Sequence, residues 1–380
     1  MNFYFDNAAT TKIKPEVLNS MMPYLNEEYG NPSSLYSLGR KAKRAIEQSR
    51  MQLANLINSE KNEIYFTSGG TESDNTAIKG IAYKYKNKGN HIITSKIEHH
   101  AVLESCKFLE TQGFKVTYLN VDNNGFIDLK ELENAITDKT ILISIMFANN
   151  EIGTIEPIEH ISKIAKKNNV IFHTDAVQAL GNINIDVKKL EVDILSISSH
   201  KIYGPKGVGG LYVRKGIDFS EFINGGHQEK NKRAGTENLA GIVGFGKACE
   251  LLYNDLENHI FHIKDLREYY INQVKENIPN IKINGSINHR LPGNANISFL
   301  GVDSTALLLE LDKNGICASS GSACNSNESS PSHVLTAIGL NNDMSKSALR
   351  TTFGYFNTRI EVDYLIQVLK NRVNFLRMLT

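Results

Sequence analysis

The chain has few cysteines, no long apolar run and almost no net charge, and each shortage excludes a class of protein. Its four cysteines contain no Cys-x-x-Cys pair, so we expect no metal site, and a chain of 380 residues needs no disulfide framework. No stretch approaches the roughly 18 apolar residues of a membrane helix, and the opening residues, MNFYFDNAATTK, do not read as a secretory signal. A formal net charge of +1 disfavours a nucleic-acid partner. We therefore expect a cytoplasmic protein that binds neither membranes nor nucleic acids.

The composition that is present is that of an ordinary globular protein, with 41% hydrophobic and 22% charged residues. From about residue 60 to 215, short apolar runs such as VIFHTDA and DILSISS alternate with amphipathic helical segments. The runs are apolar throughout, which is typical of strands buried on both faces. This pattern predicts an α/β fold with a mainly parallel sheet covered by helices on both sides.

The pattern changes after a long helical region that spans about residues 238 to 278. Strand-like stretches (IKING, NANISFL) and helical ones (STALLLELDKN) then predict a smaller α+β unit. A chain of 380 residues is also too long for one simple core. We therefore predict a large α/β domain at residues 15–259, and a small α+β domain made of residues 1–14 and 260–380.

Several small polar residues follow the apolar runs, where the ligands of open α/β sheets bind. Gly70 and Thr71 follow EIYFTS, in a turn where glycine lets the backbone approach a ligand and a helix start favours an anion. Ser198 and His200 stand at the end of DILSISS. We expect these four residues to form an anion site for a phosphate group.

A lysine and an aspartate stand at two of these strand ends. Lys201 lies at the mouth of a buried sheet, where an amine is costly, and Schiff-base chemistry is the main use for such a lysine. Asp175 ends VIFHTDA and can keep a pyridine nitrogen protonated. His99 is placed to stack on a ring, and Asn150 to reach the ring's phenolic oxygen or a substrate carboxylate. With the anion site, these residues predict a site for pyridoxal 5'-phosphate.

The four cysteines differ in their surroundings. Cys106, Cys249 and Cys317 lie in apolar patterns and are interpreted as small buried hydrophobic residues. Cys324 lies in the polar run CASSGSACNSNESSP, where it has no apolar core to join. A chemical role is therefore expected for Cys324.

Ten motifs occur in the order found in one enzyme family. They are DNAATT (6–11), GNPSS (30–34), TSGGTESDN (67–75), EHHAVLE (98–104), NNEIGTIEPI (149–158), HTDAVQALG (173–181), SSHKIYGPKGVGGLY (198–212), GGHQEKNKRAGTEN (225–238), SSGSAC (319–324) and ALR (348–350). Over nearly its whole length the chain resembles the cysteine desulfurases of the NifS/IscS type. These are pyridoxal-phosphate enzymes of fold type I in the class V aminotransferase superfamily. The resemblance therefore implies a large domain with a mainly parallel sheet of the seven-stranded type, and a smaller α+β domain.

The resemblance assigns a role to each matching residue. It implies that Lys201 is the Schiff-base lysine, that Asp175 is the partner of the pyridine nitrogen and that His99 stacks on the ring. It also implies a bond from Gln178 to the phenolic oxygen. The resemblance further implies that Asn150 and Arg350 clamp the substrate carboxylate. It implies that Thr236 contacts the phosphate in the neighbouring subunit of a homodimer. Cys324 is implied to be the nucleophilic thiol, on a mobile loop at about residues 322 to 331.

The activity implied is the conversion of L-cysteine to L-alanine, with Lys201 and His99 as proton-transfer groups and the sulfur held on Cys324 as a persulfide. A sulfur-acceptor protein, such as an iron–sulfur scaffold or a thiolation enzyme, is the expected partner. Two departures from the family pattern, NSNESSP after Cys324 and Tyr355 in place of the usual arginine, leave the acceptor open. The alternatives are a selenocysteine lyase, a class V aminotransferase, or an inactive partner protein in a sulfur-transfer complex.

Overall fold

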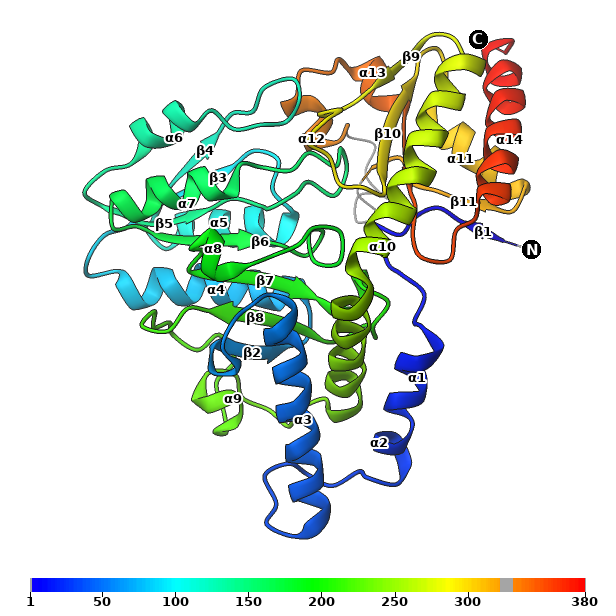
Figure 1. The fold of residues 1–380 in the computed structure, drawn as a ribbon. Helices are drawn as coiled ribbons and strands as arrows, with labels where there is room; N and C mark the ends of the chain where they lie inside the picture. The colour runs from blue at the N-terminus through cyan, green and yellow to red at the C-terminus, as the bar shows by residue number, and fades with distance from the viewer. Residues whose placement is uncertain (1, 322–330, 380) are drawn as a thin grey trace.

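The computed structural model describes residues 2–321 and 331–379. A seven-stranded sheet lies at the centre of its larger part, in the order β2-β8-β7-β6-β5-β3-β4 (Figure 1). Its strands are β2 Ile64–Thr67, β3 His91–Ser95, β4 Lys115–Leu119, β5 Thr140–Ser144, β6 Ile171–Asp175, β7 Ile194–Ser198 and β8 Gly209–Val213. Six strands of this sheet run in one direction and β8 alone runs in the opposite direction, so the predicted mainly parallel sheet is confirmed.

Helices cover both faces of this sheet, which explains why β3, β5, β7 and β8 are buried at every position. The helices α4 (Gly70–Tyr85) and α5 (His100–Thr111) pack on one face, and α3 (Ser37–Leu56), α7 (Ile158–Lys167) and the first half of α10 (Leu239–Asn277) pack on the other. Adjacent residues of β7 take opposite sides, because Ile194 joins the core under α4 and Leu195 joins the core under α10. Each strand therefore needs apolar side chains at successive positions.

A second, smaller core lies around an antiparallel sheet in the order β12-β10-β9. These strands are β9 Ile281–Ile283, β10 Asn294–Phe299 and β12 Ala348–Thr352, and the two-residue strands β1 Phe3–Tyr4 and β11 Ile316–Cys317 pair in parallel beside them. The remaining helices are α1 Pro15–Met21, α2 Pro23–Asn26, α6 Leu129–Ala135, α8 Val187–Leu190, α9 Gln228–Asn231, α11 Ser304–Lys313, α12 His333–Ala337, α13 Asn342–Lys346 and α14 Arg359–Arg377, with short 3-10 turns at Lys61–Glu63 and Ser199–Lys201.

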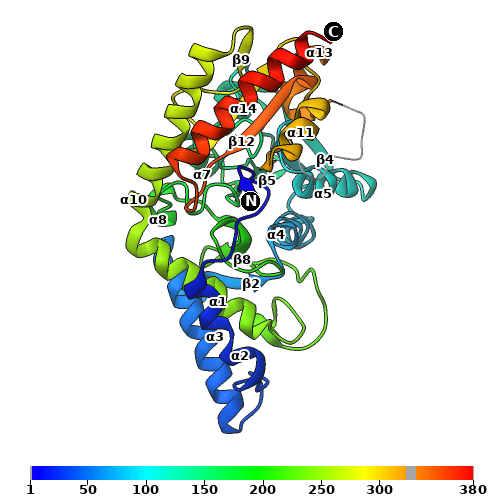
Figure 2. The same cartoon turned by 90° about the vertical axis from the view of Figure 1, so that its right-hand side faces the viewer.

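Helix α10 connects the two cores (Figures 1 and 2). Its first half contributes Phe245 and Leu252 to the core of the large sheet, whereas Ile263 and Tyr270 belong to the smaller core. Between them, Asp255 leaves the helical conformation with φ −140° and ψ 18°. The boundary predicted after residue 259 falls inside this helix, and the division into two domains stays a prediction. None of the helices in the described part of the chain combines the length and apolar composition that a bilayer crossing requires.

A buried ion pair holds the segment that follows the large sheet. Arg50 of α3 donates to both carboxylate oxygens of Glu229, at 2.7 and 2.8 Å, and the two side chains are only 4% and 2% exposed. Glu229 also accepts from the backbone N–H of Phe66, and Arg50 donates to the carbonyl of Ile64. The pair therefore fixes the start of α9 against β2.

We expect Arg50→Met to destabilise the protein by about 3–5 kcal/mol, because it leaves the Glu229 carboxylate buried without its cation. Chemical denaturation of the variant and the parent under identical conditions measures this loss. The matched control is Lys41→Met, since Lys41 pairs with Glu28 at an exposed site (51% and 27%) and such pairs contribute at most about 1 kcal/mol. Equal losses in the two variants would contradict a structural role for the buried pair.

Candidate active site

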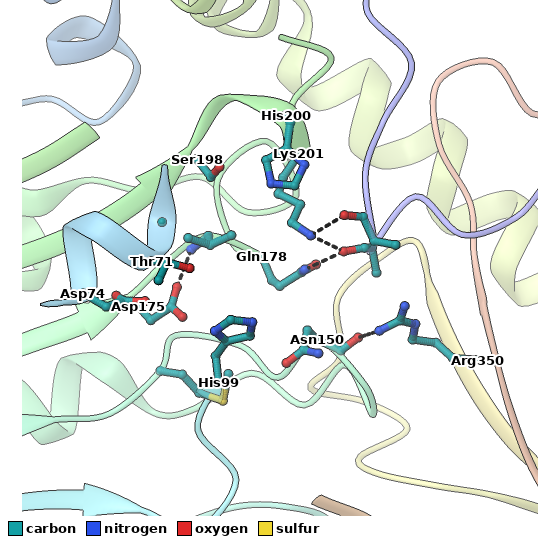
Figure 3. Close-up of a pocket in the computed structure, with 15 residues that line it drawn as sticks. Thr71, Asp74, His99, Asn150, Asp175, Gln178, Ser198, His200, Lys201 and Arg350 are labelled. Carbon is teal, nitrogen blue, oxygen red and sulfur yellow. Dashed lines mark hydrogen bonds between the residues drawn. The ribbon is translucent and has the colours of Figure 1, made fainter. Parts of the chain in front are cut away.

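A cavity of about 240 Å³ lies at the carboxyl ends of the central strands, and Figure 3 shows the side chains around it. Residues from elements of both the large and the small sheet line it. They are Ala8, Ala9, Gly70, Thr71, Asp74, His99, Met146, Asn150, Asp175, Val177, Gln178, Ser198, His200, Lys201 and Arg350. The structure thus brings ten residues singled out in the sequence into one cavity, as the position of ligands in open α/β sheets predicts.

Lys201 enters the cavity from the short turn after β7. Its Nζ donates to the carbonyl oxygens of Ala8, at 2.5 Å, and Ala9, at 2.7 Å. The N-terminal segment that supplies these carbonyls is itself fixed, because the backbone N–H of Thr11 donates to the carbonyl of His200 at 2.9 Å. The amine is therefore held at one position by backbone atoms, which no side-chain pattern in the sequence indicates.

Asp175 ends β6 and faces the same space. It is 6% exposed, and its Oδ1 accepts from the backbone N–H of Val177 at 2.9 Å. Burial raises the pKa of Asp175, whereas the Val177 N–H and the positive charge of Lys201 lower it. Gln178, one turn further on, donates from Nε2 to the carbonyl of Ala8 at 3.0 Å. The net effect raises the pKa of Asp175 to about 6, so Asp175 is a buried acid whose ionised form is supported by one N–H donor and one nearby positive charge.

His99 caps the start of α5, and this fixes which of its nitrogens carries hydrogen. Its Nδ1 accepts from the backbone N–H of Ala101 at 3.1 Å. Burial, followed by the charge of Lys201, lowers the pKa of His99 to about 4, so the ring is neutral near pH 7. A neutral ring that accepts at Nδ1 carries its proton on Nε2. His99 therefore offers a hydrogen-bond donor, which suits a positioning contact better than removal of a proton.

The opposite end of the cavity suits an anion. Gly70 and Thr71 begin the 16-residue helix α4, whose first N–H groups have no partner within the helix. A Cβ atom at Gly70 would lie 2.7 Å from Cγ2 of Val177, so only glycine lets the chain come this close. The hydroxyl of Ser198 is buried and has no hydrogen-bond partner among the described residues. The Nδ1 of His200 lies 3.1 Å from the Thr10 hydroxyl.

Arg350 comes from β12 of the smaller sheet and is 1% exposed. It donates to the carbonyl of Asn150 at 3.1 Å and to the carboxylate of Asp6 at 2.8 Å. Its Nε has no hydrogen-bond partner within the described part of the chain. A buried guanidinium with an unused donor beside a cavity is suited to bind a carboxylate.

Two predicted site residues are not among those that line the cavity. Thr236 is exposed in the segment before α10, so its predicted contact with the phosphate of a neighbouring subunit stays a prediction. Cys324, and almost all of the loop predicted to be mobile, lie outside the described residues. The other cysteines behave as predicted at two positions, because Cys106 and Cys249 are buried, whereas Cys317 is partly exposed.

Sequence reasoning missed Asp74, which lies next to Asp175 in the cavity (Figure 3). Asp74 lies inside the motif TSGGTESDN, one turn into α4, but no role was assigned to it. A signal was available, because Asp74 shares a helix face with Ile78 and Ile81, three to four residues apart, and that face is buried.

Comparison with known proteins agrees with this geometry. The family model described as aminotransferase class-V matches residues 3–365. A cysteine desulfurase IscS of Clostridium botulinum is 54% identical over 96% of this chain and 93% of its own length, and one of Dictyoglomus turgidum is 51% identical over 99% and 96%. A solved NifS-like protein superposes with a TM-score of 0.93, at 38% identity, covering 99% of this chain and all of its own. A structure described as SspA in complex with cysteine gives a TM-score of 0.83 at 37% identity, covering 94% of this chain and all of its own.

The chain therefore belongs to the class V aminotransferase family, with the fold that the sequence motifs imply. Within that family, its place is among the IscS-type and NifS-like cysteine desulfurases, as the resemblance predicts.

Proposed function

We propose that this protein is a cysteine desulfurase that uses pyridoxal 5'-phosphate to convert L-cysteine to L-alanine and keeps the sulfur on Cys324 as a persulfide. The observation that carries the proposal is the meeting of Lys201, Asp175 and Arg350 in one cavity. These are an amine, an acid and a carboxylate-binding guanidinium, and they come from β12 and from the ends of two neighbouring strands of the large sheet. Relatives named cysteine desulfurase, up to 54% identical, support the choice of reaction.

The cavity fits this cofactor at both ends. The unpartnered hydroxyl of Ser198 and the start of α4 at Gly70 suit the phosphate, and Asp175 suits a protonated ring nitrogen. When bound, the cofactor supplies an aldehyde that reacts with amines and a ring that accepts electrons from the substrate. In this proposal His99 would lie against the ring, and Gln178, whose Nε2 donates to the carbonyl of Ala8, would offer that donor to the ring's phenolic oxygen.

The side chains then divide the reaction among them. Arg350, with Asn150, fixes the substrate carboxylate and so directs the Cα–H bond towards Lys201, which takes that proton. Asp175 holds a negative charge beside the ring nitrogen. The thiolate of Cys324 attacks the substrate sulfur, so that an S–S bond forms while the C–S bond breaks and its electron pair stays on carbon. Protons return to Cα and Cβ. The net change is cysteine plus a thiol giving alanine plus a persulfide, and no outside oxidant is needed.

The partner and the compartment are part of the same proposal. We propose a homodimer in which Thr236 of one subunit reaches the phosphate of the other, and its exposed position outside its own cavity supports this. The persulfide then passes to an acceptor protein, such as an iron–sulfur scaffold or a thiolation enzyme. The three cysteines in the described part of the chain are unpaired, which suits the reducing cytoplasm.

The experiment that tests the function is incubation of the holoenzyme with L-cysteine, followed by measurement of alanine and of the mass of each cysteine-containing peptide. We expect one alanine per sulfur transferred and one extra sulfur atom on the peptide that contains Cys324. A selenocysteine lyase would instead act on selenocysteine with little alanine from cysteine, and an inactive partner protein would form none.

We expect Arg350→Lys to raise the KM for L-cysteine by about 10- to 100-fold. Lysine keeps the charge but loses the planar pair of donors, and a hydrogen bond to a charged group contributes about 1.5–3 kcal/mol. Steady-state kinetics of alanine formation measure the change. The matched control is Arg359→Lys, because Arg359 lies at the exposed start of α14 and pairs only weakly with Asp265, at 3.6 Å. An unchanged KM in Arg350→Lys would remove Arg350 from the substrate site.

A further inference from the structure

A second acid lies beside Asp175 at the bottom of the cavity. Asp74 of α4 is 1% exposed, and its Oδ1 has no hydrogen-bond partner among the described residues. One oxygen of Asp74, one oxygen of Asp175 and one ring nitrogen of His99 all lie within 4.8 Å of one another (Figure 3). Two carboxyl groups this close in a buried space cannot both carry a charge without a large cost.

The surroundings decide which of the two acids is ionised. Asp175 receives the Val177 N–H at 2.9 Å and lies near the positive charge of Lys201. For Asp74, burial raises the pKa well above its usual range, and the charge of Asp175 raises it further. The hydroxyl of Ser196 offsets this only in part. The negative charge of the pair therefore belongs on Asp175.

The side chain best placed to supply a compensating positive charge to Asp74 is neutral near pH 7. The nearest candidate is His173 of β6, whose Nε2 lies 3.6 Å from Oδ1 of Asp74. Complete burial lowers the pKa of His173 to about 3, and its two nitrogens face the hydroxyls of Ser144, at 2.8 Å, and Ser196, at 2.9 Å. Two further titratable neighbours are His99, whose pKa burial lowers to about 4, and Glu98, a buried acid whose charge disfavours ionisation of Asp74 further.

We propose that Asp74 is a positioning residue that keeps its proton, so that the acid pair presents a single negative charge, held by Asp175, to the ring of the cofactor. The proposal rests on the function proposed above. One negative charge matches one proton on the ring nitrogen. A second charge at Asp74 would draw a proton onto Asp175 and remove the partner that the ring nitrogen needs. As a neutral acid, Asp74 fills the space behind Asp175 with a polar group and excludes water from it.

Infrared difference spectroscopy of the holoenzyme at pH 7 tests the protonation state directly. We expect Asp74→Asn to remove one carbonyl band of a protonated carboxyl group, and Asp175→Asn to remove a carboxylate band instead. Glu98→Gln is the matched control, because burial raises the pKa of Glu98 to about 8 and its own acid band is expected to vanish while that of Asp74 stays. The loss of a carboxylate band in Asp74→Asn would overturn the proposal.

A second measurement separates positioning from simple packing. We expect the pH midpoint of the bound cofactor's visible absorption to move by less than about 0.5 unit in Asp74→Asn, since the amide carries the same charge as the acid, whereas removal of a real charge from this site would move it by about one unit or more. Asp74→Ala is expected to weaken binding of pyridoxal phosphate by about tenfold, because water enters beside Asp175, and Asp74→Asn is expected to restore most of that affinity. Equal affinities in the two variants would rule out the positioning role.

These results remain distinct from the proposed function. If the parent enzyme formed no alanine from L-cysteine, the reaction would be wrong, while the infrared bands of the acid pair would still report where its proton lies.

Discussion

Replacing Lys201 with alanine is expected to lower alanine formation from L-cysteine by about 10³-fold or more. Lys201 is the amine that the carbonyls of Ala8 and Ala9 hold in the cavity, and in the proposed reaction it both binds the cofactor and takes the Cα proton. Proton transfer by a positioned side chain alone contributes about 10²- to 10⁴-fold. The measurement is the initial rate of alanine formation at saturating cofactor, together with the visible spectrum of the purified protein.

Two further variants separate the chemistry of this amine from its charge. Lys201→Arg keeps a cation but not a group that gives up its proton near neutral pH, so it should be nearly as inactive as the alanine variant. Lys206→Ala removes an exposed lysine five positions away and should leave the rate within about twofold of the parent, as is usual for surface changes. A Lys201→Ala enzyme with more than about a tenth of the parent rate, at matched folding, would show that another group does this work.

The parts of the fold that followed from the sequence are those in which burial leaves a repeated pattern. Both faces of β6 and β7 are covered, so nearly every residue in them is buried, their sequences do not alternate between core and solvent residues, and their positions could be predicted. The long helical region predicted at about residues 238 to 278 is α10, which starts at Leu239 because the side chain of Asn238 caps it. The reversal of β8 and the break at Asp255 left no such pattern, since strand direction and a local change of φ and ψ depend on tertiary packing.

The active site likewise has features that the sequence predicts and features that depend on the folded structure. Residues directly after a strand, such as Asp175 and Lys201, could be predicted because parallel strands bring their ends to one edge of the sheet. The carbonyls of Ala8 and Ala9 could not, since every residue has a carbonyl and only the fold chooses which one meets the amine. Tyr355 is similar, because its ring lies 3.5 Å from Nζ of Lys14, a contact between residues far apart in the sequence. Tyr355, which stands where the family usually has arginine, therefore has Lys14 as its contact partner.

Replacing Cys324 with serine is expected to abolish sulfur transfer, with alanine formation from L-cysteine falling by about 10³-fold or more. A serine hydroxyl at neutral pH is a far weaker nucleophile towards sulfur than a thiolate, and loss of a covalent nucleophile commonly costs this much or more. The described residues that flank the segment around Cys324 support the assignment of Cys324 as the nucleophile. Ser332 donates to the carboxylate of Glu151 at 2.6 Å, and a Cβ atom at Gly321 would lie 3.1 Å from the same carboxylate. Glu151 adjoins Asn150 of the cavity, so Gly321 and Ser332, which flank this segment, both lie close to a residue that borders the site.

The other cysteines make this test specific. Cys317→Ser is the matched control, because Cys317 is partly exposed in β11 and has no place in the proposed reaction. Burial raises the pKa of Cys106 to about 12, so its thiol is neutral in the pH range of the assay and cannot replace Cys324 as a nucleophile. A class V aminotransferase has no use for the thiol, so undiminished amino transfer from L-cysteine to an α-keto acid by Cys324→Ser would identify the enzyme as a transaminase. Loss of sulfur transfer with cofactor binding intact would instead place the sulfur chemistry on this one side chain.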